Sequence, residues 1–121
     1  MRIGLDIMGG DFTPLEPLKG ALLAKKEFPG ADIVLIGNLD EARPVMQELG
    51  INENDFSLIH APETIGMAES PTKAIMSKKQ SSIAIGFGML KEKQLDCFIS
   101  AGNTGAMMVG AMYSVKPIEG I

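Results

Sequence analysis

Short apolar runs and longer amphipathic stretches alternate along this chain, which predicts strands separated by helices. Runs rich in β-branched and aliphatic residues occupy positions 2–7, 32–36, 56–60 and 95–100, the pattern of four strands. Helical spacing or helix-start signals follow at 14–28, 40–50, 71–78, 81–93 and 103–115. Strands that alternate with helices indicate a largely parallel sheet covered by helices on both faces. The predicted fold class is therefore α/β.

Local residue types predict details of these elements. The run at 32–36 lies between two glycines and is continuously apolar after its first residue, which favours a strand buried on both faces. Asp11 or Thr13 is suited to cap the first helix, and Asp40 the second, because their side-chain oxygens can accept from free N–H groups of the first turn. Gly86 and Gly88 fall inside a predicted helix and are expected to permit close packing of that helix.

Length and composition limit the range of functions. The 121 residues are expected to form one α/β unit over 1–121, incomplete because residues 116–121 close no further element. The net charge of −4 is spread along the chain, so neither a nucleic-acid partner nor an anionic membrane surface is expected. Cys97 is the single cysteine and favours a reducing, cytoplasmic setting. The uncharged stretch 97–115 is broken by small polar residues and is expected to be buried soluble structure. Most of the nine methionines are expected in the core.

The segment from residue 100 to residue 106 is the best candidate for a binding site. It connects the fourth predicted strand to a helix, and Gly102 and Gly105 allow the backbone to approach a ligand closely. Ser100, Asn103 and Thr104 add side-chain donors beside the free N–H groups of a helix start, a combination suited to phosphate. A tight strand-to-helix turn capped by Asn103 or Thr104 is the alternative, because the Lys of a P-loop and the full dinucleotide fingerprint are both missing.

A second glycine-rich turn follows the first predicted strand. Asp6 and Asp11 flank Gly9 and Gly10 at a strand's carboxyl end, the rim where open α/β sheets bind ligands. The carboxylates can accept hydrogen bonds or hold a cation, and the alternative is a turn with a helix cap. Two glycine-rich turns on one rim indicate a site more strongly than either turn alone.

Lys78, Lys79, Ser81 and Ser82 place two cations and two hydroxyls before a helix. They could hold a phosphate or the anionic arm of a carrier substrate, and the alternative is a solvated face with a serine cap. His60, the only histidine, is expected to have a structural role at a strand end. Neither a metal-ligand cluster nor a nucleophile elbow is present in the sequence, and no cofactor or metal is expected.

Three segments together resemble the phosphate acyltransferase family of bacterial phospholipid synthesis. They are residues 3–11, residues 70–82 with their Ser-Pro, Lys-Lys and Ser-Ser pairs, and residues 100–106. The chain departs from the family pattern at Phe12 and Met76-Ser77, and it matches about the first third of the family's length. The resemblance implies a three-layer α/β/α sandwich with a Rossmann-like, mostly parallel sheet, similar to phosphotransacetylases and isopropylmalate-dehydrogenase-like enzymes.

The resemblance also implies a reaction and its partners. The family transfers a fatty acyl group from acyl carrier protein to inorganic phosphate, giving acyl phosphate for glycerol-3-phosphate acylation. A cytoplasmic homodimer is expected, with a functional link to a membrane glycerol-3-phosphate acyltransferase and a peripheral membrane contact as an alternative. Asn103, Lys78 and Asp6 are the expected catalytic residues. Binding of phosphate or the carrier arm is expected from Gly9, Gly10, Asp11, Lys79, Ser81, Ser82, Ser100, Gly102, Thr104 and Gly105. Two other functions stay open: a non-catalytic module for phosphate-bearing ligands, and a phosphotransacetylase-like enzyme that uses coenzyme A thioesters.

Overall fold

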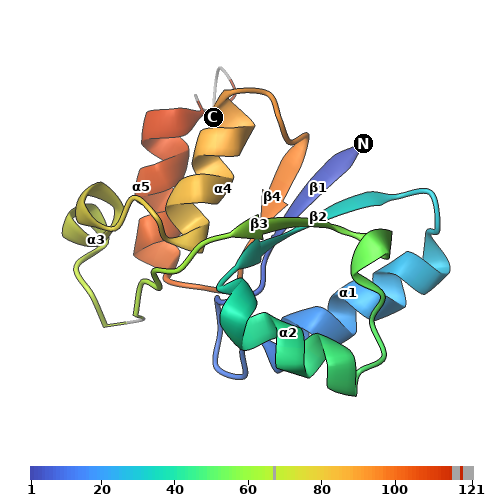
Figure 1. Ribbon diagram of the computed structural model, residues 1–121. Coiled ribbons are helices and arrows are strands. Elements are labelled where there is room, and N and C mark those ends of the chain that lie inside the picture. Colours follow the sequence, from blue (N-terminus) through green and yellow to red (C-terminus); the bar gives the residue numbers. More distant parts are fainter. Residues whose placement is uncertain (67, 116–117, 119–121) are drawn as a thin grey trace.

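The computed structural model describes residues 1–66, 68–115 and 118 (Figure 1). The elements along the chain are β1 (Arg2–Asp6), α1 (Leu15–Glu27), β2 (Asp32–Gly37), α2 (Leu39–Glu48), the 3₁₀ turn η1 (Glu53–Asp55), β3 (Ser57–His60), α3 (Pro71–Ser77), α4 (Ser82–Lys91), β4 (Cys97–Ile99) and α5 (Thr104–Ser114). The predicted strands and helices are all confirmed, with ends that shift by a few residues. Most of the predicted tail, 116–121, lies outside the described residues.

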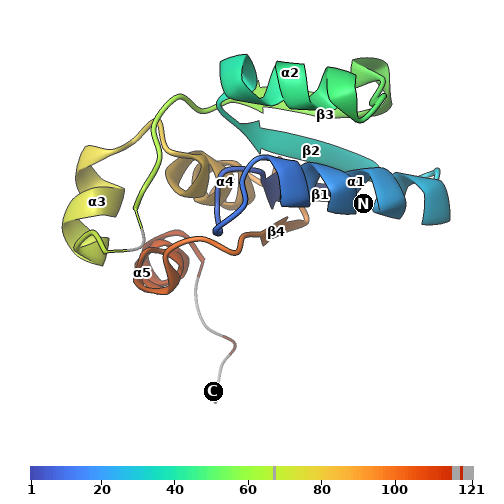
Figure 2. The same ribbon diagram turned by 90° about the horizontal axis from the view of Figure 1, so that it is seen from below.

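The four strands form one parallel sheet in the order β3-β2-β1-β4. Helices α1 and α2 cover one face, and α3, α4 and α5 lie on the other, so the predicted three-layer Rossmann-like arrangement is confirmed (Figures 1 and 2). The chain moves outward from β1 to β3 and then crosses back to β4 on the far side of β1. This reversal of direction between β1 and β4 is the topological switch point, where folds of this class bind ligands.

Strand β2 supplies the core on both faces of the sheet. Ile33 and Leu35 pack with α1 and α2, whereas Val34 and Ile36 pack in a second cluster beneath α4. All four side chains are buried, which confirms the prediction of a strand covered on both faces. A third cluster, around Phe87, joins α3, α4 and α5.

The caps of α1 and α2 differ from the prediction. Helix α1 follows Pro14 without a side-chain cap, so neither Asp11 nor Thr13 has that role. Helix α2 is capped by Asn38, whose Oδ1 accepts from the backbone N–H of Asp40 at 3.1 Å. The helix starts at Leu39, so Asp40 lies in its first turn and is not the cap. Its negative charge there interacts favourably with the helix dipole.

The two glycines of α4 have different surroundings. A Cβ at Gly86 would lie 2.3 Å from the ring of Phe98 on β4, so this glycine allows the helix to pack closely on the sheet, as predicted. Nothing lies within 4 Å of a Cβ at Gly88. The close helix-to-helix contact is made elsewhere, where Gly110 of α5 meets the ring of Phe87.

The prediction that most methionines lie in the core holds for half of the eight that the structure describes, counting Met89 and Met107, which are partly buried against core clusters. Of the eight, only Met8 and Met46 are buried, whereas Met1, Met76, Met108 and Met112 are exposed. Two of the exposed methionines belong to α5, whose outer side is not covered by any described element. The uncharged stretch is divided between β4 and the 11-residue α5. In the described part of the chain no helix has the length and apolar character needed to cross a membrane.

Candidate functional site

The two predicted glycine-rich turns lie against each other at the switch point. A Cβ at Gly9 would lie 2.7 Å from the backbone nitrogen of Gly102 and 2.6 Å from Oδ2 of Asp6. Only glycine fits there without moving backbone atoms. The structure therefore brings the turn after β1 and the turn after β4 together on one rim, as the sequence pattern predicted.

Asp6 connects these turns through hydrogen bonds. Its Oδ1 accepts from the N–H groups of Met8 at 2.8 Å and Gly9 at 3.0 Å, and its Oδ2 accepts from the Ser100 hydroxyl at 2.7 Å. Ser100 Oγ in turn accepts from the Gly102 N–H at 3.0 Å. Asp6 is only 2% exposed, and its three donors compensate for the loss of water around the carboxylate. One buried side chain thus sets the shape of both turns.

A pocket of about 370 Å³ opens beside the turns. Its walls are formed by Leu5, Asp6, Gly9, Gly10, Asp11, Phe12, Thr13, Glu16, Pro17, Ile99, Ser100 and Ala101. The lining is mainly apolar, and its charged members are carboxylates, so no lysine or arginine stands among these described lining residues. A phosphate bound here would need its positive charge from another part of the protein.

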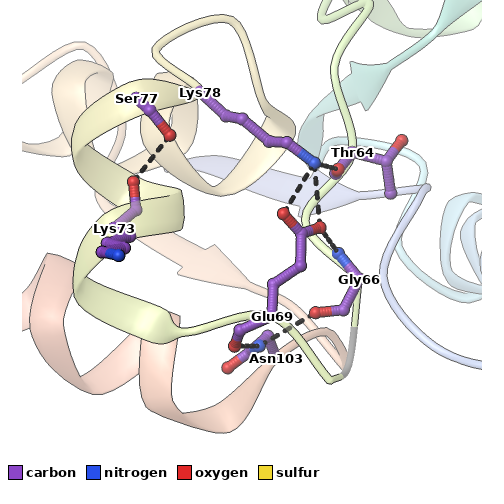
Figure 3. Close-up of polar contacts among 7 residues, drawn as sticks. All are labelled: Thr64, Gly66, Glu69, Lys73, Ser77, Lys78 and Asn103. Atoms are coloured by element: carbon purple, nitrogen blue, oxygen red, sulfur yellow. Dashed lines mark hydrogen bonds and ion pairs between the residues drawn. The ribbon is translucent and has the colours of Figure 1, made fainter.

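Asn103 has both ends of its amide engaged and is 4% exposed. Its Oδ1 accepts from the N–H of Ala106 at 3.0 Å, which makes Asn103 the N-cap of α5. Its Nδ2 donates to the backbone carbonyls of Gly66 at 3.0 Å and Glu69 at 3.2 Å (Figure 3). The predicted cap is confirmed, and the side chain also attaches the loop before α3 to the start of α5.

Lys78 is held by the same loop. Its ammonium donates to the Glu69 carboxylate at 2.8 Å and to the carbonyl of Thr64 at 2.9 Å (Figure 3). Glu69 also accepts from the Gly66 N–H. Lys78 and this N–H hold the pKa of the Glu69 carboxyl below its usual value, against a small opposing effect of burial. Sequence reasoning missed Glu69, because no local spacing connects a loop carboxylate with a lysine nine positions later.

The other predicted residues of this region differ in their access to solvent. Ser81 is fully buried, and its Oγ accepts from the N–H of Ala84 at 3.2 Å, which confirms the serine cap. Ser82 is 3% exposed, whereas Lys79 and Thr104 are exposed. The two serine hydroxyls thus lie inside the molecule, and the lysine and threonine side chains face outward.

Two further residues complete the placement of the candidates. A Cβ at Gly105 would lie 2.3 Å from the ring of Pro71, so this glycine lets α3 and α5 approach each other. His60 accepts through Nδ1 from the N–H of Leu39 at 3.2 Å, which confirms its structural role. Within the ranges that the structure describes, no three His, Cys, Asp or Glu side chains group as metal ligands would.

Comparison with known proteins places the chain in a family. The family model described as fatty acid synthesis protein matches residues 1–121. A phosphate acyltransferase of Thermoanaerobacterium thermosaccharolyticum is 45% identical over 121 residues, which is all of this chain and 35% of that protein. Phosphate acyltransferases of Dictyoglomus turgidum and Magnetococcus marinus are 44% and 40% identical over the same 121 residues, covering 36% and 35% of their lengths.

The match covers all of this chain but only part of each relative. The chain spans about a third of the length of the curated relatives it matches, and the alignment covers every segment that carries the two turns, Lys78 and Asn103. The match over the whole chain establishes that it belongs to the fatty acid synthesis protein family.

Proposed function

We propose that the protein containing this chain transfers a fatty acyl group from acyl carrier protein to inorganic phosphate. The observation that carries the proposal is the pair of glycine-rich turns joined by Asp6 and Ser100 at the switch point, in a chain 45% identical to a protein named phosphate acyltransferase. The product, an acyl phosphate, would supply a membrane glycerol-3-phosphate acyltransferase. A cytoplasmic homodimer with a peripheral membrane contact is part of this proposal.

The chemistry requires no enzyme nucleophile. A phosphate oxygen attacks the thioester carbonyl, the carbon–sulfur bond breaks, and the carrier leaves as a thiolate that takes up a proton. The protein must align phosphate with the carbonyl and stabilise the negative charge that develops on its oxygen. We assign phosphate to the Gly102–Gly105 turn, where Thr104 is exposed and the first N–H groups of α5 carry partial positive charge.

The remaining candidates act around that turn. Asp6 holds Ser100 and the backbone of Gly102 in place, and Gly9 and Gly10 leave room for the substrate in the neighbouring pocket. Lys79 is exposed and would supply the cation that the pocket lining lacks. Asn103 and Lys78 make their contacts with the loop before α3, so we assign both to holding the site's shape.

The test is phosphate-dependent thiol release from a long-chain acyl carrier protein by the complete protein. Asp6→Asn should lower turnover by about ten- to a hundredfold, because misplacement of about 1 Å at a reacting centre can cost a hundredfold. Asp40→Asn is the matched control, since Asp40 is an exposed carboxylate of α2. Wild-type turnover in Asp6→Asn would exclude the assigned role of Asp6.

Two outcomes would replace the proposed function. Release from coenzyme A thioesters but not from the carrier would indicate a phosphotransacetylase-like enzyme. Phosphate binding by the complete protein without release from either thioester would indicate a non-catalytic binding module.

A further inference from the structure

Glu69 contacts Lys78 and Asn103, two of the three residues that the family resemblance implied to be catalytic. Its carboxylate accepts from Lys78, and its backbone carbonyl accepts from Nδ2 of Asn103 (Figure 3). Gly66 reinforces the same arrangement, since its N–H donates to the Glu69 carboxylate and its carbonyl accepts from Asn103. Thr64, Gly66 and Glu69, from the loop before α3, therefore bridge Lys78 and the start of α5, and Glu69 occupies the centre of the bridge.

The ion pair is well formed for a pair near the surface. Nζ of Lys78 lies 2.8 Å from each oxygen of the Glu69 carboxylate, and the side chains are 32% and 37% exposed. Partial shielding from water weakens screening compared with a fully exposed pair. Lys78 also donates to the Thr64 carbonyl, so its ammonium could approach a substrate anion only by giving up contacts within the loop.

We infer that Glu69 is a positioning residue of the phosphate site, an inference that rests on the proposed function. The carboxylate of Glu69 neutralises Lys78, and this ion pair holds the loop in contact with Asn103. Asn103 in turn caps the first turn of α5, where phosphate is assigned. Of the adjacent lysines, Lys78 then has an internal role and the exposed Lys79 is the one that meets the substrate anion.

Turnover measurements on the complete protein separate these roles. Glu69→Gln keeps the side-chain shape but removes its charge. It should lower kcat by about tenfold, because a displaced turn misaligns phosphate with the thioester, and change the KM for phosphate little, because Glu69 itself makes no contact with phosphate. Lys79→Met should instead raise the KM for phosphate. Glu63→Gln and Lys73→Met are the matched controls and should behave as wild type, because Glu63 precedes the bridging residues and accepts from the Gln80 N–H, and Lys73 is exposed.

A double-mutant cycle tests whether Glu69 acts through Lys78. Lys78→Met should lower kcat as Glu69→Gln does, and the double variant should be no worse than the poorer single variant. Lys78→Arg keeps the ion pair and should retain most of the activity. Multiplicative losses in the double variant, or a Glu69→Gln effect confined to the KM for phosphate, would overturn the inference.

Hydrogen exchange at the Gly66 and Ala106 amides provides a readout that needs no substrate. Glu69→Gln and Lys78→Met should speed exchange at Gly66 and, through Asn103, at Ala106, while Glu63→Gln should leave both amides protected as in wild type. Unchanged exchange in both variants would refute the bridge even if the protein proves active. Faster exchange in a protein without phosphate-dependent release would keep the bridge and refute its role in acyl transfer, and with it the proposed function.

Discussion

Asp6 and Glu69 show how differently two carboxylates are stabilised in one small fold. Asp6 is almost completely buried and accepts from two N–H groups and one hydroxyl. Glu69 is partly exposed and accepts from a lysine ammonium and an N–H group. Donors in fixed positions make Asp6 a rigid connection between two turns, whereas the contact of Glu69 depends on a flexible lysine side chain and on its charge.

This dependence on charge predicts a pH effect at Glu69. Because Lys78 and the Gly66 N–H lower the pKa of the carboxyl from 4.5, the ionised form is favoured in the folded state. Its contribution to stability is fully present above that unfolded-state value and disappears as the pH falls through the lower folded-state value. Urea unfolding of wild type and Glu69→Gln should therefore give a gap in stability that is constant near neutral pH and closes in acid. A gap that widens below pH 4.5 would contradict this assignment.

At the scale of elements, glycines decide how closely α4 packs on the sheet. Gly86 lets the helix rest on the edge of the Phe98 ring, and that ring also meets Phe87 edge-to-face, with centroids 5.4 Å apart. Two residues later, a Cβ added at Gly88 would lie in open space. The same residue type thus has a packing function at one position of α4 and none at the other.

The pair predicts stability changes of opposite sign. Gly86→Ala should destabilise the fold by about 1–3 kcal/mol, because its Cβ would overlap the Phe98 ring. Gly88→Ala should stabilise it by about 0.5–1 kcal/mol, since alanine favours a helix interior and meets no neighbour. Denaturant unfolding of the two variants checks both values. Equal changes would show that helix propensity, not the contact with Phe98, dominates at Gly86.

At the scale of the whole molecule, β4 forms an outer edge of the sheet in the described structure. It pairs with β1 on one side, and no described strand pairs with its other side. Ile99 on this strand is 53% exposed and also lines an apolar depression beside α1. An accessible edge that carries apolar side chains is a template for pairing with another chain.

The open edge predicts self-association of the 121-residue chain. Its mass should rise with concentration in analytical ultracentrifugation, and Ile99→Lys should reduce this rise because a charge on an edge strand opposes pairing. Gln47→Lys, on the exposed side of α2, adds the same charge away from the edge and is the control. An equal reduction by both variants would attribute the effect to net charge instead of the edge.

Local patterns predicted the chemistry of the two turns but not the bridge around Glu69. Gly102, Asn103 and Ser100 stand within a few positions of one another at a strand end, so their residue types alone indicated a turn with donors. Their partner Asp6 lies 94 residues before Ser100, and the loop carbonyls bonded to Asn103 lie 34 and 37 residues before it. Which donor pairs with which acceptor over such separations depends on the path of the whole chain.

Periodicity and turn chemistry act over a few residues, so the order of amino acids alone was enough to predict the elements, the α/β class and the glycine-rich turns at strand ends. The strand order, the contact of Gly9 with Gly102, and the hydrogen bonds by which Lys78 and Asn103 hold a loop could be seen only in the folded chain. The same is true of which methionines are buried and which residue caps α2. These features arise from contacts between distant segments, and the crossover from β3 to β4 creates them when it brings the two turns to the same point of the sheet.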